Sequence, residues 1–259
     1  MSSDQAANLR RIAGSQRKCR YISVSSGKGG VGKTTFAVSL ATELSKRAKR
    51  VILFDADLGL ANVDVLLRIT PGANIRDYLA GNVALKEVIV KTSLGFDLFP
   101  ASSGVLELSE LSEEEFNKVK GVLKRLESEY EYIVFDTGAG INANVHRFTR
   151  LADKMVVITL PEPAAISDAY AFLKTAVRQY NVTAAYLLFN RVEEEAAALR
   201  IFENLKGVVK RFLNTDLMLL GMLREDQQVK RSARGARALS VFEGSSAFTE
   251  SVRRIAAVL

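Results

Sequence analysis

One stretch near the start of the chain constrains the fold more than any other. Residues 21–35 read Tyr-Ile-Ser-Val-Ser-Ser-Gly-Lys-Gly-Gly-Val-Gly-Lys-Thr-Thr. A β-branched run leads into a glycine-rich turn, and helix-compatible residues follow at once. This is the setting required by the phosphate-binding pattern G-x-x-x-x-G-K-[ST], whose fixed positions are Gly27, Gly32, Lys33 and Thr34. The stretch predicts a strand, a loop and a helix that bind a nucleoside triphosphate.

The composition of this loop follows from the chemistry of phosphate binding. Glycines let backbone N–H groups point inward at phosphate oxygens, and the next helix directs the positive end of its dipole at the same anions. We expect Lys33 to hold the β- and γ-phosphates and the Thr34 hydroxyl to ligate Mg²⁺. The loop residues that we expect at the nucleotide are Gly27, Lys28, Gly29, Gly30, Val31, Gly32, Lys33, Thr34 and Thr35.

A second lysine, Lys28, follows the first glycine of the pattern and gives Lys-Gly-Gly-Val-Gly-Lys-Thr. This sequence resembles the deviant Walker A motif of the MinD/ParA family of ATPases. The resemblance implies ATP as the nucleotide and a homodimer that forms on ATP binding. In that family the extra lysine reaches across the dimer interface to the partner's phosphates, so Lys28 joins Lys33 as an expected catalytic residue. Considered alone, a lysine at this position is usually a solvated loop residue.

Aspartates follow two buried-strand patterns farther along the chain. Residues 51–54 are apolar and end in Asp55-Ala56-Asp57, and open α/β sheets place ligands at such strand ends. Residues 55–64 resemble the switch I segment of MinD, which implies that Asp57 positions or activates the attacking water. The alternative is a strand-end aspartate that caps the next helix.

The second acidic strand end is Asp136, which closes the apolar run 132–135 as a Walker B strand requires. Residues 136–141 resemble the switch II segment of the same family. We therefore expect Asp136 to hold the Mg²⁺ shell through water, and Gly138 or Gly140 to sense the γ-phosphate.

The expected base contacts lie near the carboxyl end of the strand pattern 185–189. Asn190 falls where the family's asparagine reads the adenine edge, and its amide can both donate and accept hydrogen bonds. Arg191 follows it in the expected nucleotide-binding set, while an ordinary turn asparagine is the competing interpretation. Arg224 stands where a related loop of the family usually carries proline. That departure leaves the base contact from this loop open.

Strand patterns alternate with helix patterns along the whole chain, which predicts one α/β domain with a mainly parallel sheet and helices on both faces. The 259 residues, 48% of them hydrophobic, suffice for one large core. We expect the P-loop ATPase domain to span residues 20–259, after an N-terminal extension of residues 1–19. The single cysteine, Cys19, excludes an internal disulfide and a paired-cysteine metal carrier.

The extension contains Asp-Gln-Ala-Ala-Asn-Leu-Arg at residues 4–10. This segment resembles the N-terminal activator motif of the MinD-like regulators of flagellar number, the FlhG/FleN type. The resemblance implies that the protein stimulates a signal-recognition-type flagellar GTPase. The residues expected to activate that partner are Asp4, Gln5, Leu9 and Arg10.

Charge and targeting signals leave other partners open. A net charge of +7 suits an anionic partner, either DNA or acidic lipid, and a basic cluster lies at Lys230, Arg231, Arg234 and Arg237. The basic, polar first residues do not resemble a signal peptide, so we expect a cytoplasmic protein. The chain ends before the amphipathic helix that targets MinD-like proteins to membranes, so a peripheral place at the inner membrane face is the weaker expectation. A ParA-like DNA-partitioning ATPase and a MinD-like division-site ATPase stay open as alternatives.

Overall fold

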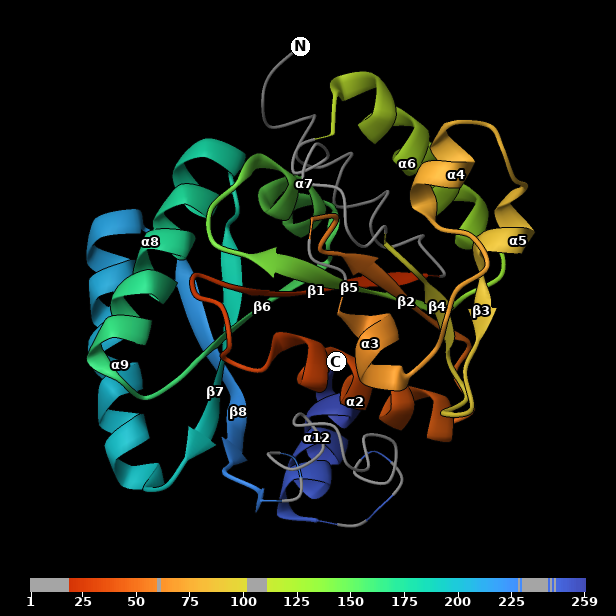
Figure 1. Ribbon diagram of the computed structural model, residues 1–259. Helices are drawn as coiled ribbons and strands as arrows, with labels where there is room; N and C mark the ends of the chain where they lie inside the picture. The colour runs from red at the N-terminus through yellow and green to blue at the C-terminus, as the bar shows by residue number, and fades with distance from the viewer. Residues whose placement is uncertain are drawn as a thin grey trace.

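The computed structural model describes residues 19–59, 62–101, 111–227, 229, 242, 244 and 246–259. An eight-stranded sheet forms the centre of the molecule, in the order β3-β4-β2-β5-β1-β6-β7-β8 (Figure 1). The strands are β1 (Arg20–Ser26), β2 (Val51–Ala56), β3 (Val90–Lys91), β4 (Asp97–Phe99), β5 (Tyr132–Ala139), β6 (Lys154–Thr159), β7 (Ala184–Val192) and β8 (Asp216–Arg224). Every pairing is parallel except that of β3 with β4. The predicted mainly parallel sheet is confirmed.

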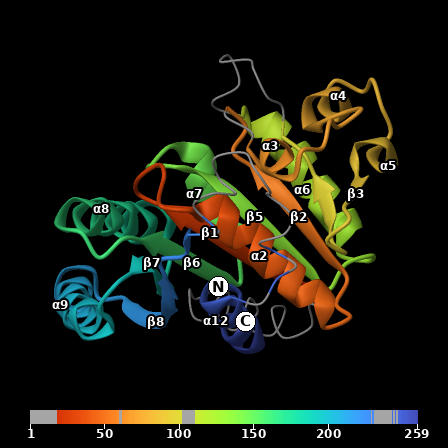
Figure 2. The ribbon, with the colours of Figure 1, turned by 60° about the horizontal axis from the view of Figure 1, so that its bottom comes forward.

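Helices cover both faces of this sheet, as predicted (Figures 1 and 2). One face carries α2 (Lys33–Lys46), α3 (Val63–Leu67) and α12 (Ala247–Val258), and the other carries α6 (Glu113–Leu126), α7 (Ala143–Leu151), α8 (Pro163–Tyr180) and α9 (Glu195–Leu213). The short helices α4 (Ile75–Leu79) and α5 (Leu85–Val88) pack near the β3 end. Because helices bury both faces, the inner strands are apolar throughout rather than alternating.

The same topology determines where the acidic strand ends lie. β2 pairs with β5 so that Asp55 is directly opposite Asp136, and β5 pairs in turn with β1, which leads into the glycine-rich loop. The carboxyl ends of β1, β2 and β5 therefore meet at one edge of the sheet. This edge is where doubly wound sheets bind ligands.

Local signals account for most element boundaries. Ser112 caps α6 with a capping box to Glu115, and the apolar stripe of α6 is buried, both as the sequence predicts. The two-residue strand β3 is not predictable from its sequence, because so short an antiparallel edge carries no periodicity. In the described part of the chain, no helix is both long enough and apolar enough to cross a lipid bilayer.

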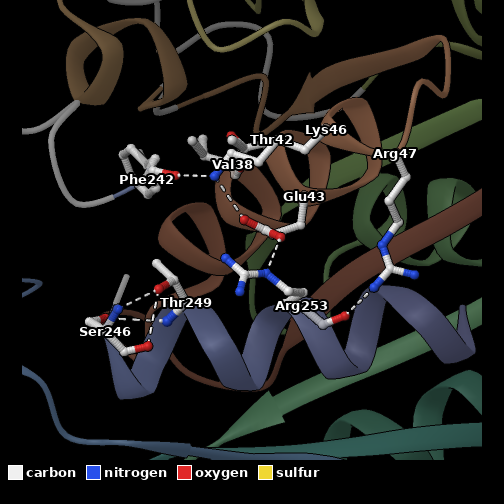
Figure 3. Close-up of polar contacts among 9 residues, drawn as sticks. All are labelled: Val38, Thr42, Glu43, Lys46, Arg47, Phe242, Ser246, Thr249 and Arg253. Atoms are coloured by element: carbon white, nitrogen blue, oxygen red, sulfur yellow. Dashed lines mark hydrogen bonds and ion pairs between the residues drawn. The ribbon is translucent and has the colours of Figure 1, made fainter. Parts of the chain in front are cut away.

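The helix α12 packs along α2, the helix that follows the glycine-rich loop, through a polar cluster (Figure 3). Glu43 is only 3% exposed and takes an ion pair from Lys46 at 2.9 Å and another from Arg253 at 3.2 Å. Lys46 also donates to the Phe242 carbonyl at 3.0 Å, and Arg47 donates to the Arg253 carbonyl at 2.6 Å. These bonds, together with apolar packing, anchor α12 to the loop-proximal helix.

The only histidine of the sequence, His146, lies in α7 and is buried inside the fold. Its ring is 0% exposed and stacks between Phe172 at 4.9 Å and Tyr180 at 4.6 Å, measured between ring centroids. Neither ring nitrogen has a hydrogen-bond partner among the described residues. Burial lowers the pKa of His146 to about 4, so the ring is neutral in the folded protein at physiological pH.

This burial predicts a pH-dependent stability with a definite sign. The folded pKa of about 4 lies below the ordinary value of 6.5, so between these values the unfolded chain binds more protons at His146 and stability falls as the pH falls. The window amounts to about 3 kcal/mol. We expect the free energy of unfolding of His146→Phe, relative to that of wild type, to rise by roughly that amount from pH 7 to pH 4, because only wild type has this histidine to protonate. Urea unfolding of both proteins at the two pH values measures the difference. Parallel pH profiles for the two proteins would contradict this account.

Candidate nucleotide-binding site

The glycine-rich loop joins β1 to α2 as the sequence predicts, and close packing explains two of its glycines. A Cβ at Gly27 would overlap the backbone carbonyl of Asp168 in α8. Gly32 has φ +98°, and a Cβ there would overlap the side-chain amide nitrogen of Asn190. The loop is thus held between α8 on one side and the end of β7 on the other, and larger residues do not fit at either position.

A cavity of about 570 Å³ opens above this loop. Its walls come from the loop and α2, from the segment after β2, and from the segment after β5, and include Gly29, Gly30, Gly32, Lys33, Thr34, Thr35, Asp57, Leu58, Asn62, Gly138, Asn142 and Asn144. The predicted residues Lys33, Thr34 and Asp57 therefore share one cavity. Its size is within the range of sites that enclose a small organic ligand.

The two loop lysines occupy different environments. Lys33 is 8% exposed, and burial lowers its pKa, although the charges of Asp136 and Asp57 act in the opposite direction. Lys28 is exposed at the loop surface. A buried cation among carboxylates is placed to bind phosphate from within the site, whereas the exposed Lys28 is not among the residues that line the cavity.

Burial also disfavours the charged forms of the carboxylates around Lys33. Asp136 is 2% exposed, and burial raises its pKa to about 7 against the opposing effects of the Thr34 hydrogen bond and the Lys33 charge. Burial also raises the pKa of Asp55 well above its ordinary value, and the neighbouring Asp136 adds to this. A Cβ at Gly138 would be 3.2 Å from Asp57 Oδ1, so the Asp57 carboxylate lies close to the backbone at the end of β5.

The residues here fit a hydrated Mg²⁺ ion. Asp136 Oδ1 is buried and has no hydrogen-bond partner among the described residues, and such an atom costs stability unless a ligand satisfies it. The Thr34 hydroxyl, bonded to the same carboxylate, is the oxygen that phosphate-binding loops offer to Mg²⁺. Hydroxyl and carboxylate oxygens are the donors that this cation prefers.

Asp55 has a role that the sequence pattern did not reveal. Its Oδ1 atom accepts the Asp57 N–H at 3.1 Å, and its Oδ2 atom accepts the N–H groups of Asn62 at 3.3 Å and Val63 at 3.4 Å. Asp55 therefore anchors both ends of the segment 57–63 that carries Asp57. The Asp-x-Asp spacing was the available signal, but only the folded loop shows which aspartate binds backbone.

Asn190 and Arg191 contact the loop itself. The Asn190 amide donates to the Val31 carbonyl at 2.8 Å and accepts the Arg191 N–H at 2.9 Å. The Arg191 guanidinium donates to the Gly30 carbonyl at 2.9 Å. Base reading by Asn190 stays a prediction, and in this structure its amide braces the loop from β7.

A second, smaller cavity of about 70 Å³ lies on the β7 side of the loop. It is lined by Gly32, Thr35, Asn190, Arg191, Arg224, Glu225, Asp226, Val229 and Phe248. Arg224 therefore borders the expected base side of the nucleotide, and both its Nε and Nη2 atoms donate to Glu195 Oε1, at 3.1 and 2.9 Å.

Two groups of predicted residues lie outside the described part of the chain. They are the activator-like residues Asp4, Gln5, Leu9 and Arg10, and the basic cluster Lys230, Arg231, Arg234 and Arg237. The predictions for them stay predictions.

Fold and site together define a nucleotide-dependent ATPase of the P-loop class. The AAA domain family matches residues 19–186. The antiactivator FleN of Pseudomonas aeruginosa is 35% identical over 226 residues, which cover 87% of this chain and 81% of FleN. The flagellum site-determining protein YlxH of Helicobacter pylori is 36% identical over 245 residues, covering 93% of this chain and 81% of YlxH.

Solved structures agree with these sequence relatives. A MinC:MinD cell division protein complex of Aquifex aeolicus is similar with a TM-score of 0.73 at 27% identity, over 93% of this chain and 95% of that one. The chain therefore belongs to the MinD/ParA family of P-loop ATPases, in its FleN and YlxH (FlhG-type) branch, and it hydrolyses ATP with Mg²⁺. The resemblance stated from the two-lysine loop is confirmed.

Lys33→Ala should lose ATP binding, because Lys33 is the buried cation inside the cavity. Charge-assisted hydrogen bonds contribute about 1.5–3 kcal/mol each, so loss of contacts to two phosphates should weaken binding by at least about 100-fold. Isothermal titration with Mg·ATP measures this, after circular dichroism has shown that the variant folds. Lys28→Ala is the matched control and should bind ATP nearly as wild type does. Unchanged affinity in Lys33→Ala would remove Lys33 from the site.

Proposed function

We propose that this protein is an ATP-dependent dimerising switch that regulates the number or placement of flagella. The observation that carries the proposal is the pair of loop lysines, with Lys33 buried in the cavity and Lys28 exposed on the same loop. The relatives named for flagellar site determination and for antiactivation support the flagellar role.

Electrostatics explains how a second subunit would strengthen the attraction between Lys28 and a phosphate. Opposite charges 4 Å apart interact by about 1 kcal/mol in water and about 4 kcal/mol at the effective dielectric of a partly excluded protein site. In a single protomer Lys28 is exposed to water, where the attraction is the weaker of the two. A second protomer that covers the cavity excludes water and moves Lys28 toward the stronger attraction, next to its partner's phosphates. ATP thereby favours the dimer.

The chemistry of the switch follows from the side chains around the cavity. Lys33 and the loop N–H groups hold the triphosphate, and Asp57 orients a water for attack on the γ-phosphorus. The new P–O bond forms as the bond to the β-phosphate oxygen breaks, which leaves ADP and phosphate. Thr34 and Asp136 hold Mg²⁺, which supplies positive charge to the phosphate oxygens when bound. Loss of the γ-phosphate removes the bridge to Lys28, and the dimer dissociates.

Turnover by such a switch should be slow, below the ~1–10³ s⁻¹ of ordinary enzymes, because the output is a timed change of partners rather than product. The flagellar partner in this proposal is a signal-recognition-type GTPase that residues 4–10 stimulate. We place the protein in the cytoplasm, where its dimer can also associate with the inner membrane face. A ParA-like DNA-binding dimer and a division-site ATPase are the alternatives that the experiments below separate.

Asp57→Ala and Lys28→Ala should have opposite effects on the dimer. Without the water-positioning carboxylate, Asp57→Ala should bind ATP, hydrolyse it at least about tenfold more slowly and stay dimeric. Lys28→Ala should bind ATP but stay monomeric, because the phosphate charges would face an interface without a counter-charge. Analytical ultracentrifugation with ADP and then ATP distinguishes the two.

Asp64→Ala is the matched control for Asp57→Ala, since Asp64 follows the segment 57–63 in α3, its carboxylate accepts the Val65 N–H at 2.7 Å, and it does not line the large cavity. It should behave as wild type. If Lys28→Ala dimerises with ATP as readily as wild type, Lys28 is only a loop lysine. Repeating the runs with anionic vesicles and with DNA tests the other partners.

A peptide of residues 1–20 should raise GTP turnover by the cognate flagellar GTPase, because a contiguous segment carries its contact residues with it. Gln5 is the proposed active side chain, since an amide that donates and accepts can orient a water at a γ-phosphate. Gln5→Ala should lose most of the stimulation, whereas Asn8→Ala, the other amide of the segment, should keep it. If neither peptide nor full protein stimulates the GTPase, the DNA-partitioning reading becomes the better one.

A further inference from the structure

We propose that Thr137 is a positioning residue for ATP hydrolysis, whose buried hydroxyl holds the end of β5 in place beside Asp57. This inference rests on the proposed role of Asp57 and adds the contacts that determine its surroundings. The observations that carry it are an irregularity in the pairing of β1 with β5 and a chain of buried hydroxyl groups that begins there.

The pairing of β1 with β5 contains one extra residue at the edge of the nucleotide site. Val24 pairs with Asp136 and Ser26 pairs with Ala139, so β5 advances by one residue more than β1 between these two pairs. An extra residue in one strand is a β-bulge, which bends that strand and interrupts the regular ladder. Bulges are frequent next to active sites, because they redirect the part of the strand that follows.

Gly138, the second residue of this bulge, borders Asp57 in the wall of the large cavity. Both residues line the cavity, and a Cβ at Gly138 would be 3.2 Å from Asp57 Oδ1 and 3.6 Å from Val145 Cγ2. The backbone at Gly138 therefore limits the space that the Asp57 carboxylate can occupy. A displacement of the bulge changes this space and with it the position of the carboxylate that orients the attacking water.

Thr137, the first residue of the bulge, begins a chain of hydroxyl groups between the sheet and α7, which packs against β1 and β5 (Figure 1). Its Oγ1 atom lies 3.1 Å from Ser25 Oγ, which lies 3.1 Å from Thr149 Oγ1. Ser25 is 0% exposed, Thr137 1% and Thr149 2%. The chain therefore connects the bulge with α7 and with the strand that leads into the glycine-rich loop.

The direction of these hydrogen bonds follows from the single hydrogen that each hydroxyl has to donate. Thr149 donates to a carbonyl of its own helix at 2.7 Å, so Ser25 must donate to Thr149. The acceptors for the Thr137 hydrogen, all 3.1 Å from Oγ1, are Ser25 Oγ and the carbonyls of Val24 and Gly138. One donor therefore serves the bulge, the neighbouring strand and the hydroxyl chain.

Loss of this hydroxyl should slow hydrolysis and spare ATP binding. Thr137→Val keeps the branched shape but removes the donor, so the side chain no longer ties the bulge to β1 and the backbone beside Asp57 can shift. A displacement of about 1 Å in a group that orients a reactant can lower a rate by roughly 10²-fold. Thr137 does not line the cavity, and the buried cation Lys33 belongs to α2, so the phosphate contacts stay in place.

The test compares kcat at saturating Mg·ATP with the Kd for Mg·ATP from isothermal titration, for full-length variants that circular dichroism shows to be folded. Thr137→Val should lower kcat by about tenfold and change the Kd by less than about twofold. Thr137→Ser restores the hydroxyl and should recover most of the wild-type kcat. Ser25→Ala should lower kcat by a smaller factor, because Thr137 keeps its two carbonyl acceptors.

Thr215→Val is the matched control for the loss of a buried threonine hydroxyl. Thr215 is 3% exposed, donates to the Leu213 carbonyl at 3.1 Å and lies just before the amino end of β8, away from the edge of the sheet that forms the cavity. It should keep the wild-type kcat. All rates are measured over a range of protein concentrations, so that a weaker dimer is not mistaken for slower chemistry.

The double variant Thr137→Val/Asp57→Ala separates this inference from the proposed function. If Thr137 acts through Asp57, the double variant should hydrolyse ATP no more slowly than Asp57→Ala. A further loss of about tenfold would overturn the inference, since residues that act separately have additive effects. It is also overturned by wild-type kcat in Thr137→Val or Ser25→Ala, by an equal loss of affinity and kcat, or by failure of serine to restore the rate. Wild-type turnover in Asp57→Ala would instead overturn the role of Asp57 in the proposed switch.

Discussion

The structure depends on one electrostatic arrangement, a buried lysine held against buried carboxylates at the edge of a parallel sheet. Lys33 and Asp136 are both almost fully buried, and burial opposes the charged form of each. Removing such groups from water is costly, and their mutual attraction offsets only part of that cost. The remaining imbalance is what makes the site receptive to a polyanion accompanied by a divalent cation, because these ligands bring the missing charges of both signs.

Side chains from other elements hold the segments that surround this arrangement. Asn190 and Arg191 tie the loop carbonyls to β7, and α12 ties the loop-proximal helix to the remainder of the fold through Glu43 and Arg253. Asp55 accepts backbone N–H groups from both ends of the segment that carries Asp57. Asp136 lies opposite Asp55 in the strand pairing, and its charge adds to the rise in the pKa of Asp55 that burial causes. The carboxylate that would hold the cation and the carboxylate that binds the Asp57 segment are therefore linked electrostatically.

Local sequence was sufficient for the parts of this molecule that local physics controls. The glycine-rich loop, the apolar strands and the Ser112 capping box each follow from residues a few positions apart, and the structure has them where the sequence predicts them. The antiparallel edge strand β3 and the backbone bonds of Asp55 depend on the folded neighbourhood instead. The environment of His146 is of the same kind, since its stacking partners come from another helix. The periodicity and spacing of residues in the sequence do not predict such contacts.

Asn190 shows most clearly why a residue's place in a pattern does not fix its contacts. Its position after β7 puts it beside the loop, and an amide there can equally satisfy a loop carbonyl or a base edge. A Cβ at Gly32 would overlap its amide nitrogen, so the loop and the asparagine pack closely together. Its bonds to Val31 and Arg191 use one of its two N–H groups and one of the two lone pairs of its oxygen, and Asn190 also lines the small cavity beside Arg224. Support of the loop and contact with a ligand are therefore compatible roles for this one amide, and its position in the pattern does not choose between them.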